Sequence, residues 1–474
     1  MLTNRIYLNF KYQDIHIEGN LLSENLILED IEENKEEYID FLKDLIQTES
    51  YNPPGNEKNV ALVIENYLKD VGVNCDVFPF GNNRANLFAT LNDNYGGRNL
   101  IYNGHMDVVP PGSEEEWKYP PLSATVKRRK IFGRGAVDMK SGLAAMTIAL
   151  KILKKLNLEL PGNLILNGVA DEEQGGYLGT NWLIENKLQS IKADFTIVGE
   201  PSGLNPLPKA IILGEKGRVE IKIVTNGISG HASVSSLGKN AIYMMSELIQ
   251  NLDQMKEHLP KSEPPLSLDE LKEMMSVAFP SQEIFNKILN EQPILQDVLK
   301  ANIELVKNLT MIKGGIKPNV IPDLCEAVID FRLLPNQTTE MVLDALKNVI
   351  KNLGYQIKNQ PTGAPEEVFV YLEVLSETEA SYWNDWRDSK ILKDFYTTVE
   401  KIYKKKPFYF FFPAGADASF YRNNGYCKPT IMFGPGVAST AHAVNEYIEI
   451  QDYINSIKVY TLFACKFLEN KLVY

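Results

Sequence analysis

The chain has 474 residues, of which 44% are hydrophobic and 23% are charged, the balance of a soluble globular protein. This length predicts two domains rather than one. A net charge of −12 disfavours nucleic acid as a partner. No apolar stretch approaches the length of a membrane span, and the first residues lack the apolar region of a signal peptide. The four cysteines, Cys75, Cys325, Cys427 and Cys465, are widely scattered, which favours buried thiols in a cytoplasmic protein over disulfides or a thiolate metal site.

The first 212 residues alternate between helical and strand patterns. Residues 1–33 are expected to form an extended appendage, strand-like in places. The patterns then predict helices at 34–50, 59–72, 140–156 and 177–188, and strands at 75–80, 85–91, 99–105, 164–170 and 195–200. The basic run at 127–130 is typical of a solvated turn between strands. Strands alternating with helices predict an α/β fold, with a mixed central sheet flanked by helices.

The pattern changes after residue 212. Residues 217–227 alternate as a half-exposed strand does, and a long helix is expected from about Asn240 to Leu259. Strands at 327–333 and 368–375 enclose a helix at 341–354, which predicts a small α+β sandwich. The α/β pattern resumes near residue 376 and ends in a long helix. We therefore predict a larger domain from residues 1–212 and 376–474, with residues 213–375 inserted as a smaller domain that carries an extra helical insertion at about 260–305.

The stretch NGHMDVVPPG, residues 103–112, places a histidine and an aspartate at the end of an apolar run. Alternate side chains of a strand share a face, so His105 and Asp107 would project together. A carboxylate in this position can accept the imidazole N–H that does not face a metal ion. The alternative is a strand that merely runs out into a loop.

Four further segments deliver metal-ligand side chains near the ends of predicted strands or the starts of helices. Each has a structural alternative, such as an acid at a helix start or a surface loop. Taken together, His, Asp and Glu without Cys suit Zn²⁺, Co²⁺ or Mn²⁺ at one edge of one sheet. The segments are GRGAVDMKSG with Asp138, VADEEQGG with Asp171, Glu172 and Glu173, IVGEPSG with Glu200, and STAHAVNEYI with His442.

The motifs GHMDVVP, GRGAVDMKSGLAA, DEEQGG, VGEP, SGHAS, KPNVIPD and AHAVNEYI occur in this order. In this order they resemble the metallopeptidase family of acetylornithine deacetylase, succinyl-diaminopimelate desuccinylase and glutamate carboxypeptidase, from about residue 34 onward. The resemblance implies two Zn²⁺ ions, with Co²⁺ or Mn²⁺ as possible substitutes. Asp138 would bridge both ions, His105 and Glu200 would complete one site, and Glu173 and His442 the other.

The same resemblance assigns the remaining roles. Asp107 would orient His105, Glu172 would be the general base for a metal-bridging water, and the Asp138–Met139 peptide would be cis. His231 would contact substrate across a homodimer formed through the inserted lid domain; taken alone, it reads as a locally hydrogen-bonded histidine. The other candidate substrate-binding residues are Asn319, Arg332 and Gly415. A structural alternative is equally consistent with the sequence: Asn319 as a turn residue and Arg332 as a cation on the surface of a sheet.

These assignments predict a metal-dependent hydrolase that cleaves the amide bond of a small N-acyl amino acid. A carboxypeptidase or dipeptidase acting on short peptides is the first alternative. Glu200 fits the deacylase and carboxypeptidase branches better than the dipeptidase branches, where the resemblance implies an aspartate. A non-catalytic binding protein that keeps the fold is the second alternative. Neither nucleic acid nor a membrane is expected as a partner.

Overall fold

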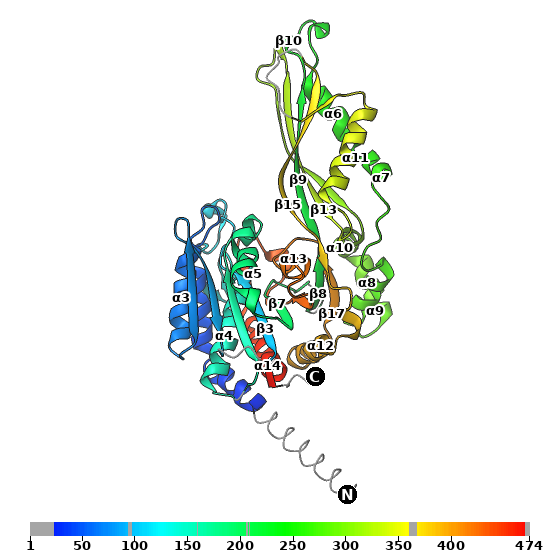
Figure 1. The fold of residues 1–474 in the computed structure, drawn as a ribbon. Coiled ribbons are helices and arrows are strands. Elements are labelled where there is room, and N and C mark those ends of the chain that lie inside the picture. The colour runs from blue at the N-terminus through cyan, green and yellow to red at the C-terminus, as the bar shows by residue number, and fades with distance from the viewer. Residues whose placement is uncertain are drawn as a thin grey trace.

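The computed structural model describes residues 23–92, 97–158, 160–204, 207, 209–359 and 367–469. Figure 1 shows a broad sheet surrounded by helices and an elongated smaller sheet that projects from it. The broad sheet is mixed, with parallel and antiparallel neighbours, and the smaller one is mainly antiparallel. This arrangement confirms the predicted fold class.

Four parallel strands form the centre of the broad sheet and set the position of the candidate site. They are adjacent in the order β6-β3-β7-β18. Every residue of β3 and β6 is buried, as expected of parallel strands covered on both faces. In the described residues the full order is β1 (Asn74–Phe80), β2 (Arg84–Thr90), β6 (Asn163–Val169), β3 (Asn99–His105), β7 (Phe195–Val198), β18 (Thr430–Met432), β8 (Ala210–Glu215) and β16 (Ser381–Tyr382), with β17 (Phe408–Phe412) also paired to β8.

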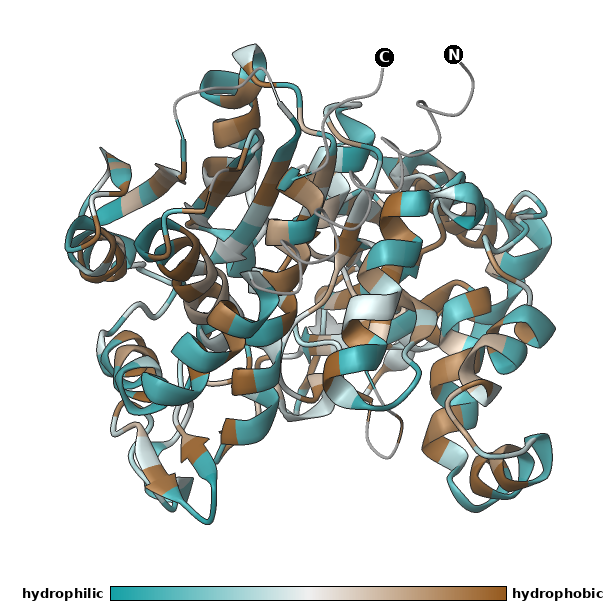
Figure 2. Ribbon diagram, turned by 90° about the horizontal axis from the view of Figure 1, so that it is seen from below, coloured by the Kyte–Doolittle hydropathy of each residue, from teal (hydrophilic) through white to brown (hydrophobic). Residues whose placement is uncertain are grey.

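The helices around this sheet are amphipathic. α12 buries Leu392, Phe395 and Val399 at i, i+3 and i+7, and Figure 2 shows hydrophobic and hydrophilic residues alternating around the helices. α4 and α14 pack against each other and against β3 and β6. No helix in the described ranges has both the length and the apolar character that crossing a bilayer requires. The helices are α2 (Lys35–Gln47), α3 (Glu57–Lys69), α4 (Lys140–Lys155), α5 (Trp182–Asn186), α12 (Lys390–Tyr403), α13 (Ala418–Asn423) and α14 (Ile450–Glu469).

The beginning of the chain corrects one prediction. Residues 23–33 are helical, not extended, whereas the rest of the predicted appendage, residues 1–22, lies outside the described residues. Ile27 and Ile31 are fully buried, and their spacing of four places both on one helical face. Asp30 accepts hydrogen bonds from Tyr38 and Lys155. Burial of this face therefore overrides the local resemblance to a strand.

The smaller sheet has the order β11-β13-β9-β15-β14 and is covered on one face by helices. Along β9, Val219, Ile221 and Ile223 are buried against those helices, while the residues between them are half-exposed on the other face. The strands are β11 (Val306–Gly314), β13 (Leu324–Leu333), β9 (Gly217–Asn226), β15 (Phe369–Thr378) and β14 (Ile357–Lys358), and the helices are α6 (Ala241–Asn251), α7 (Met255–His258) and α11 (Thr339–Asn352).

The long helix expected from Asn240 to Leu259 is divided. α6 ends at Asn251, a short 3₁₀ turn covers Leu252–Gln254, and α7 follows. A 3₁₀ turn brings residues three apart onto one side, which allows Leu252 and Met255 to stay in the core across the break.

The predicted helical insertion forms α8 (Leu268–Ser276), α9 (Gln282–Glu291) and α10 (Pro293–Ile303). α8 begins at a capping box formed by Ser267 and Glu270. Buried side chains of the three helices join the core of the broad sheet, and α8 packs against β17. We propose that the broad sheet and the smaller sheet correspond to the larger and inserted domains, with the boundaries predicted above.

A short hairpin brings two distant motifs together. β4 (Thr125–Lys127) and β5 (Lys130–Phe132) are joined through Arg128 and Arg129, both at positive φ. This confirms the predicted turn in the basic run. β5 also pairs with β19 (Tyr447–Glu449), which places the loop that starts at Gly133 beside the loop that contains His442.

Candidate metal centre

The candidate metal ligands lie where the central strands end. His105 is the last residue of β3, Glu172 and Glu173 lie in a 3₁₀ turn after β6, and Glu200 follows β7. Asp138 lies just before α4, which connects β3 to β6. Because parallel strands end at the same edge of a sheet, residues far apart in the chain meet there.

Asp138 lies between the two histidines. Its Oδ1 is 3.1 Å from His105 Nε2, and its Oδ2 is 3.1 Å from His442 Nε2. His442 Nε2 is also 3.3 Å from Glu173 Oε2. The Asp138–Met139 peptide is cis, as the resemblance implied. One carboxylate thus offers a separate oxygen to each half of the centre.

Glu200 and Glu172 approach the His105 side. Glu200 Oε1 is 3.7 Å and Glu172 Oε2 is 3.9 Å from His105 Nε2. Within the described residues, two groups of three have ligand atoms close enough to share an ion, namely His105 with Asp138 and Glu173, and His105 with Glu172 and Glu200. Oε1 of Glu173 and Oε1 of Glu200 are buried and have no hydrogen-bond partner among the residues that the structure describes. Buried carboxylate oxygens left in this state fit cation binding, so the residue set suits a metal ion.

Glu200 is held in place by close backbone packing. A Cβ on Gly142 in α4 would lie 2.1 Å from the carbonyl oxygen of Gly199, the residue before Glu200. Only glycine at position 142 lets this helix approach the end of β7 so closely.

The three adjacent acids after β6 point in different directions. Asp171, at positive φ, forms an ion pair of 3.1 Å with Arg84 and accepts a hydrogen bond from Leu178 N. Glu172 and Glu173 turn toward the histidines instead. Arg84 thus relieves part of the repulsion among these three adjacent carboxylates.

Asp107 supports both His105 and the acidic turn. The Nδ1 of His105 is 2.8 Å from the backbone oxygen of Asp107 and 3.6 Å from its carboxylate. The carboxylate accepts hydrogen bonds from the backbone N–H groups of Glu172 and Glu173, at 3.3 and 3.2 Å, and from Asn52 Nδ2 at 2.8 Å. It is completely buried. Asn52 lies 55 residues away from Asp107 in the chain, and no sequence pattern indicated this contact.

A second pair of residues, Arg134 and Glu446, also supports the candidate ligands and was not predicted from the sequence. Both side chains are buried and form an ion pair of 2.5 Å. Glu446 accepts the N–H groups of Val137 and Asp138, while Arg134 donates to the backbone oxygen of His442. The pair therefore connects the two loops that present Asp138 and His442. Both residues stand inside the quoted motifs, but their contact spans more than 300 positions.

Burial and opposite charges set the protonation of the centre. Burial raises the pKa values of Glu172, Glu173 and Glu200. The hydrogen bonds of His442 to Asp138 and Glu173 raise the pKa of His442 to about 10. Burial alone would lower the pKa of His105, but the neighbouring carboxylates raise it. A metal ion must displace such protons, so its binding should strengthen as pH rises.

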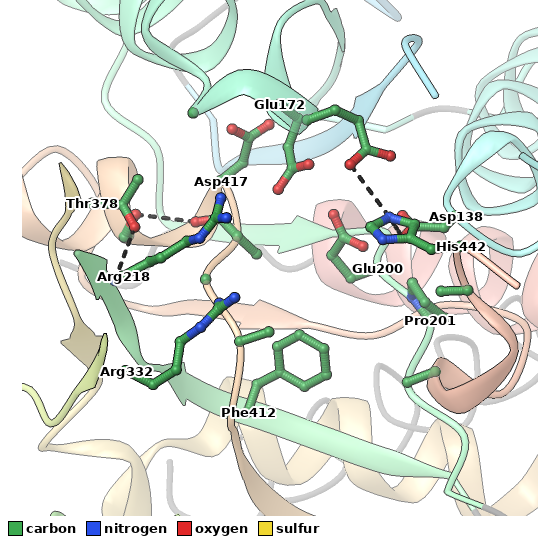
Figure 3. A pocket seen from close by; sticks show the side chains of 18 of the residues that line it. Asp138, Glu172, Glu200, Pro201, Arg218, Arg332, Thr378, Phe412, Asp417 and His442 are labelled. Atoms are coloured by element: carbon green, nitrogen blue, oxygen red, sulfur yellow. Dashed lines mark hydrogen bonds and ion pairs between the residues drawn. The ribbon is translucent and has the colours of Figure 1, made fainter. Parts of the chain in front are cut away.

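A cavity of about 370 Å³ opens onto these ligands. Asp138, Glu172 and His442 line one side, and Arg218 and Arg332 of the smaller sheet line the other (Figure 3). Two predicted substrate-binding residues, Arg332 and Gly415, thus lie in the same cavity as the candidate metal ligands. Arg218 was not singled out from the sequence.

Asp417, two residues after Gly415, is a further buried acid in this cavity. Its Oδ2 accepts hydrogen bonds from Thr180 at 2.8 Å and Asn103 at 3.2 Å. Its Oδ1 has no hydrogen-bond partner in the described part of the chain. Burial raises the pKa of Asp417 to about 7.

The other two predicted substrate-binding residues lie together but outside the cavity. His231 is in the two-residue strand β10 (Gly230–His231), which pairs with β12 (Val320–Ile321). Asn319 directly precedes β12 and accepts a hydrogen bond from Ala232 N. β10 lies at the end of the smaller sheet farthest from the broad sheet (Figure 1). His231 is exposed, and its Nδ1 contacts Ser233 Oγ at 2.6 Å.

Comparison with known proteins places the chain in a family. Residues 101–466 match peptidase family M20/M25/M40. The chain belongs to this family. Among its relatives, N-formyl-4-amino-5-aminomethyl-2-methylpyrimidine deformylase of Halalkalibacterium halodurans is 27% identical over 463 residues, covering 92% of this chain and 96% of the relative. Succinyl-diaminopimelate desuccinylase of Orientia tsutsugamushi (strain Ikeda) is 27% identical over 441 residues, covering 92% and 97%.

The fold agrees with this membership. The crystal structure of an M20 family metallo-carboxypeptidase from Sulfolobus solfataricus matches with a TM-score of 0.72 and 23% identity, covering 91% of this chain and 99% of that one. A likeness at this identity concerns the fold. The M20/M25/M40 membership and the carboxylate–histidine cluster together identify a metal-dependent hydrolase with a candidate metal site.

Proposed function

We propose that the protein is a dinuclear, zinc-dependent hydrolase that cleaves the amide bond of an N-acyl amino acid. The observation that carries this proposal is Asp138, which offers one oxygen to each of two histidines beside the buried Glu200 and the half-buried Glu172 and Glu173. The relatives named a deformylase and a desuccinylase support acyl removal by their names.

The distances support a division of the ligands into two sites. Asp138 would bridge two Zn²⁺ ions, with Co²⁺ or Mn²⁺ as substitutes. His105 and Glu200 would complete one site, and Glu173 and His442 the other. Metal ions in such pairs lower the pKa of bound water and polarise a carbonyl oxygen.

Glu172 is the proposed general base. It lies in the cavity beside the ligands, and burial raises its pKa. A raised pKa suits a carboxylate that must take a proton from the attacking water and then release it to the leaving amine. Asp107 acts on the reaction only indirectly, by holding Glu172 and Glu173 through their backbone N–H groups.

A homodimer is proposed from the smaller sheet. β11 is an edge strand that exposes apolar side chains, with Met311 66% and Ile312 57% exposed. Exposed apolar edges are prone to pair with another chain. In such a dimer His231 and Asn319, which do not reach the cavity of their own chain, would act at the cavity of the partner.

The test is a substrate panel. Protein stripped of metal and resupplied with Zn²⁺, Co²⁺ or Mn²⁺ should hydrolyse N-acetyl or N-succinyl amino acids with a higher kcat/KM than dipeptides. Higher kcat/KM on dipeptides would favour the carboxypeptidase or dipeptidase alternative. Metal binding without hydrolysis of any substrate would favour a binding protein.

A further inference from the structure

The cavity wall opposite the metal ligands is a row of donors on three neighbouring strands. Arg218 on β9 is the direct cross-strand partner of both Arg332 on β13 and Thr378 on β15. Direct partners point to the same face of a sheet, and all three residues line the cavity. Figure 3 shows Arg218 and Arg332 on the side of the cavity away from Asp138 and His442.

The next rung of the same two strands carries two acids. Asp330 on β13 is the direct partner of Glu220 on β9. Asp330 accepts hydrogen bonds from Arg218 Nε at 2.9 Å and from Arg332 Nε at 2.8 Å, while Glu220 pairs with Arg218. Neither acid lines the cavity. The two arginines therefore line the cavity, whereas the two acids that pair with them do not.

Like charges directly opposite each other destabilise a sheet. Asp330 and Glu220 offset part of this repulsion between Arg218 and Arg332, and an anion in the cavity would offset it further. Among the described residues, no hydrogen bond is made by the Nη1 group of either arginine. Two guanidinium groups therefore retain donors side by side, where they can bind carboxylates in a bidentate manner.

The spacing of the two arginines indicates what they would bind. Side chains of direct cross-strand partners begin about 4.5–5.5 Å apart. Two carboxylates on the same side of the scissile amide, such as the α- and side-chain carboxylates of an acidic amino acid, converge over this distance. Carboxylates on opposite sides of the amide would point apart once the carbonyl reaches the metal ligands.

We propose that Arg218 is a specificity-determining residue that acts with Arg332 to select an acidic amino acid, with two carboxylates, as the amine half of the substrate. The proposal rests on the proposed amide hydrolysis at the adjacent metal centre. Arg332 holds one carboxylate and Arg218 the other. The backbone N–H of Arg218 donates to the Thr378 hydroxyl at 3.2 Å, which leaves the proton of that hydroxyl free to face the cavity.

The test compares N-acetyl-L-glutamate with N-acetyl-L-glutamine, which have the same shape and differ by one charge. The wild type should prefer glutamate, and Arg218→Met should lower the ratio of the two kcat/KM values about 10- to 100-fold, the range for a lost hydrogen bond to a charged group. Arg218→Lys should give an intermediate ratio because it keeps the charge and loses the planar fork. Lys222→Met is the matched control, since Lys222 lies on the same strand and face and pairs with Glu326 at 2.6 Å. This control should leave the ratio unchanged.

A binding measurement makes the result independent of turnover. Calorimetry with free glutamate and free glutamine should show the same loss of preference in Arg218→Met, with folding of each variant checked by circular dichroism. The proposal would be overturned if folded Arg218→Met kept the wild-type ratio of kcat/KM for N-acetyl-L-glutamate over N-acetyl-L-glutamine. It would also be overturned by an Arg218-dependent preference for N-succinyl-L-alanine over its N-succinamoyl analogue. Either result would leave the hydrolase function standing. If no amide substrate is hydrolysed, the proposed function fails, and the glutamate-to-glutamine affinity ratio still decides the role of Arg218.

Discussion

Replacement of Asp107 by asparagine should weaken both folding and metal binding. The carboxylate accepts three hydrogen bonds, from Asn52 and from the backbone N–H groups of Glu172 and Glu173, and it lies near His105. In Asp107→Asn, one acceptor oxygen becomes an NH₂ group that faces donors. A hydrogen bond to a charged group contributes about 1.5–3 kcal/mol, so the loss of one or two should lower the free energy of unfolding by about 1.5–6 kcal/mol.

The effect on the metal centre follows from the same contacts. Without its carboxylate anchor, the turn that presents Glu173 loses its position, and metal affinity should fall about 10- to 100-fold, as is typical of residues that orient ligands. Urea unfolding of the metal-free protein and competition with a chromogenic chelator measure the two quantities. Glu215→Gln is the control: Glu215 is a buried carboxylate paired with Arg422 outside the site. It should destabilise the protein without changing metal affinity. Stability within about 0.5 kcal/mol of wild type, the range of neutral surface changes, together with unchanged affinity in Asp107→Asn would refute this reasoning.

Three further predictions follow from the site and the smaller sheet. Glu172→Gln should keep its bound metal and lose about 10²- to 10⁴-fold in kcat, the usual contribution of a general base, and a rate near that of the wild type would remove Glu172 from that role. Burial raises the pKa of Asp417 to about 7, so the stability due to its bound proton is present below about pH 4 and is lost as pH rises toward 7. In metal-free Asp417→Asn, the free energy of unfolding measured with urea should therefore decrease less between about pH 4 and 7 than it does in the wild type. An equal decrease in both proteins would contradict this prediction. Met311→Lys should convert dimers to monomers in analytical ultracentrifugation, and an undiminished dimer would rule out pairing through β11.

The sequence predicted the convergence of the candidate metal ligands because that convergence depends on local patterns. His105 ends an apolar run, and Glu172 and Glu200 follow two others. The alternation of strands with helices makes these runs parallel neighbours, whose ends meet at one edge. The periodicity of strands and helices was therefore enough to predict that residues about 100 positions apart lie close together.

Contacts without a local pattern could not be predicted in this way. Arg134 meets Glu446 across more than 300 positions, and neither residue is unusual in its own segment. The alternation of β9 predicted a half-exposed strand, but it could not indicate that Arg218 lies opposite Arg332, because register depends on the partner strand. Near Ile27, the prediction of extended structure was wrong because the helix is short. So few residues do not separate the helical period from the strand period.

Metal stoichiometry measured together with activity tests the central claim most directly. Metal-stripped protein is titrated with Zn²⁺ by calorimetry, and hydrolysis of N-acyl amino acids is followed in the same samples. The proposed dinuclear centre around Asp138 predicts that two ions bind per chain and that hydrolysis appears as they bind. No bound ion, or two bound ions without hydrolysis of any N-acyl amino acid or dipeptide, would contradict it.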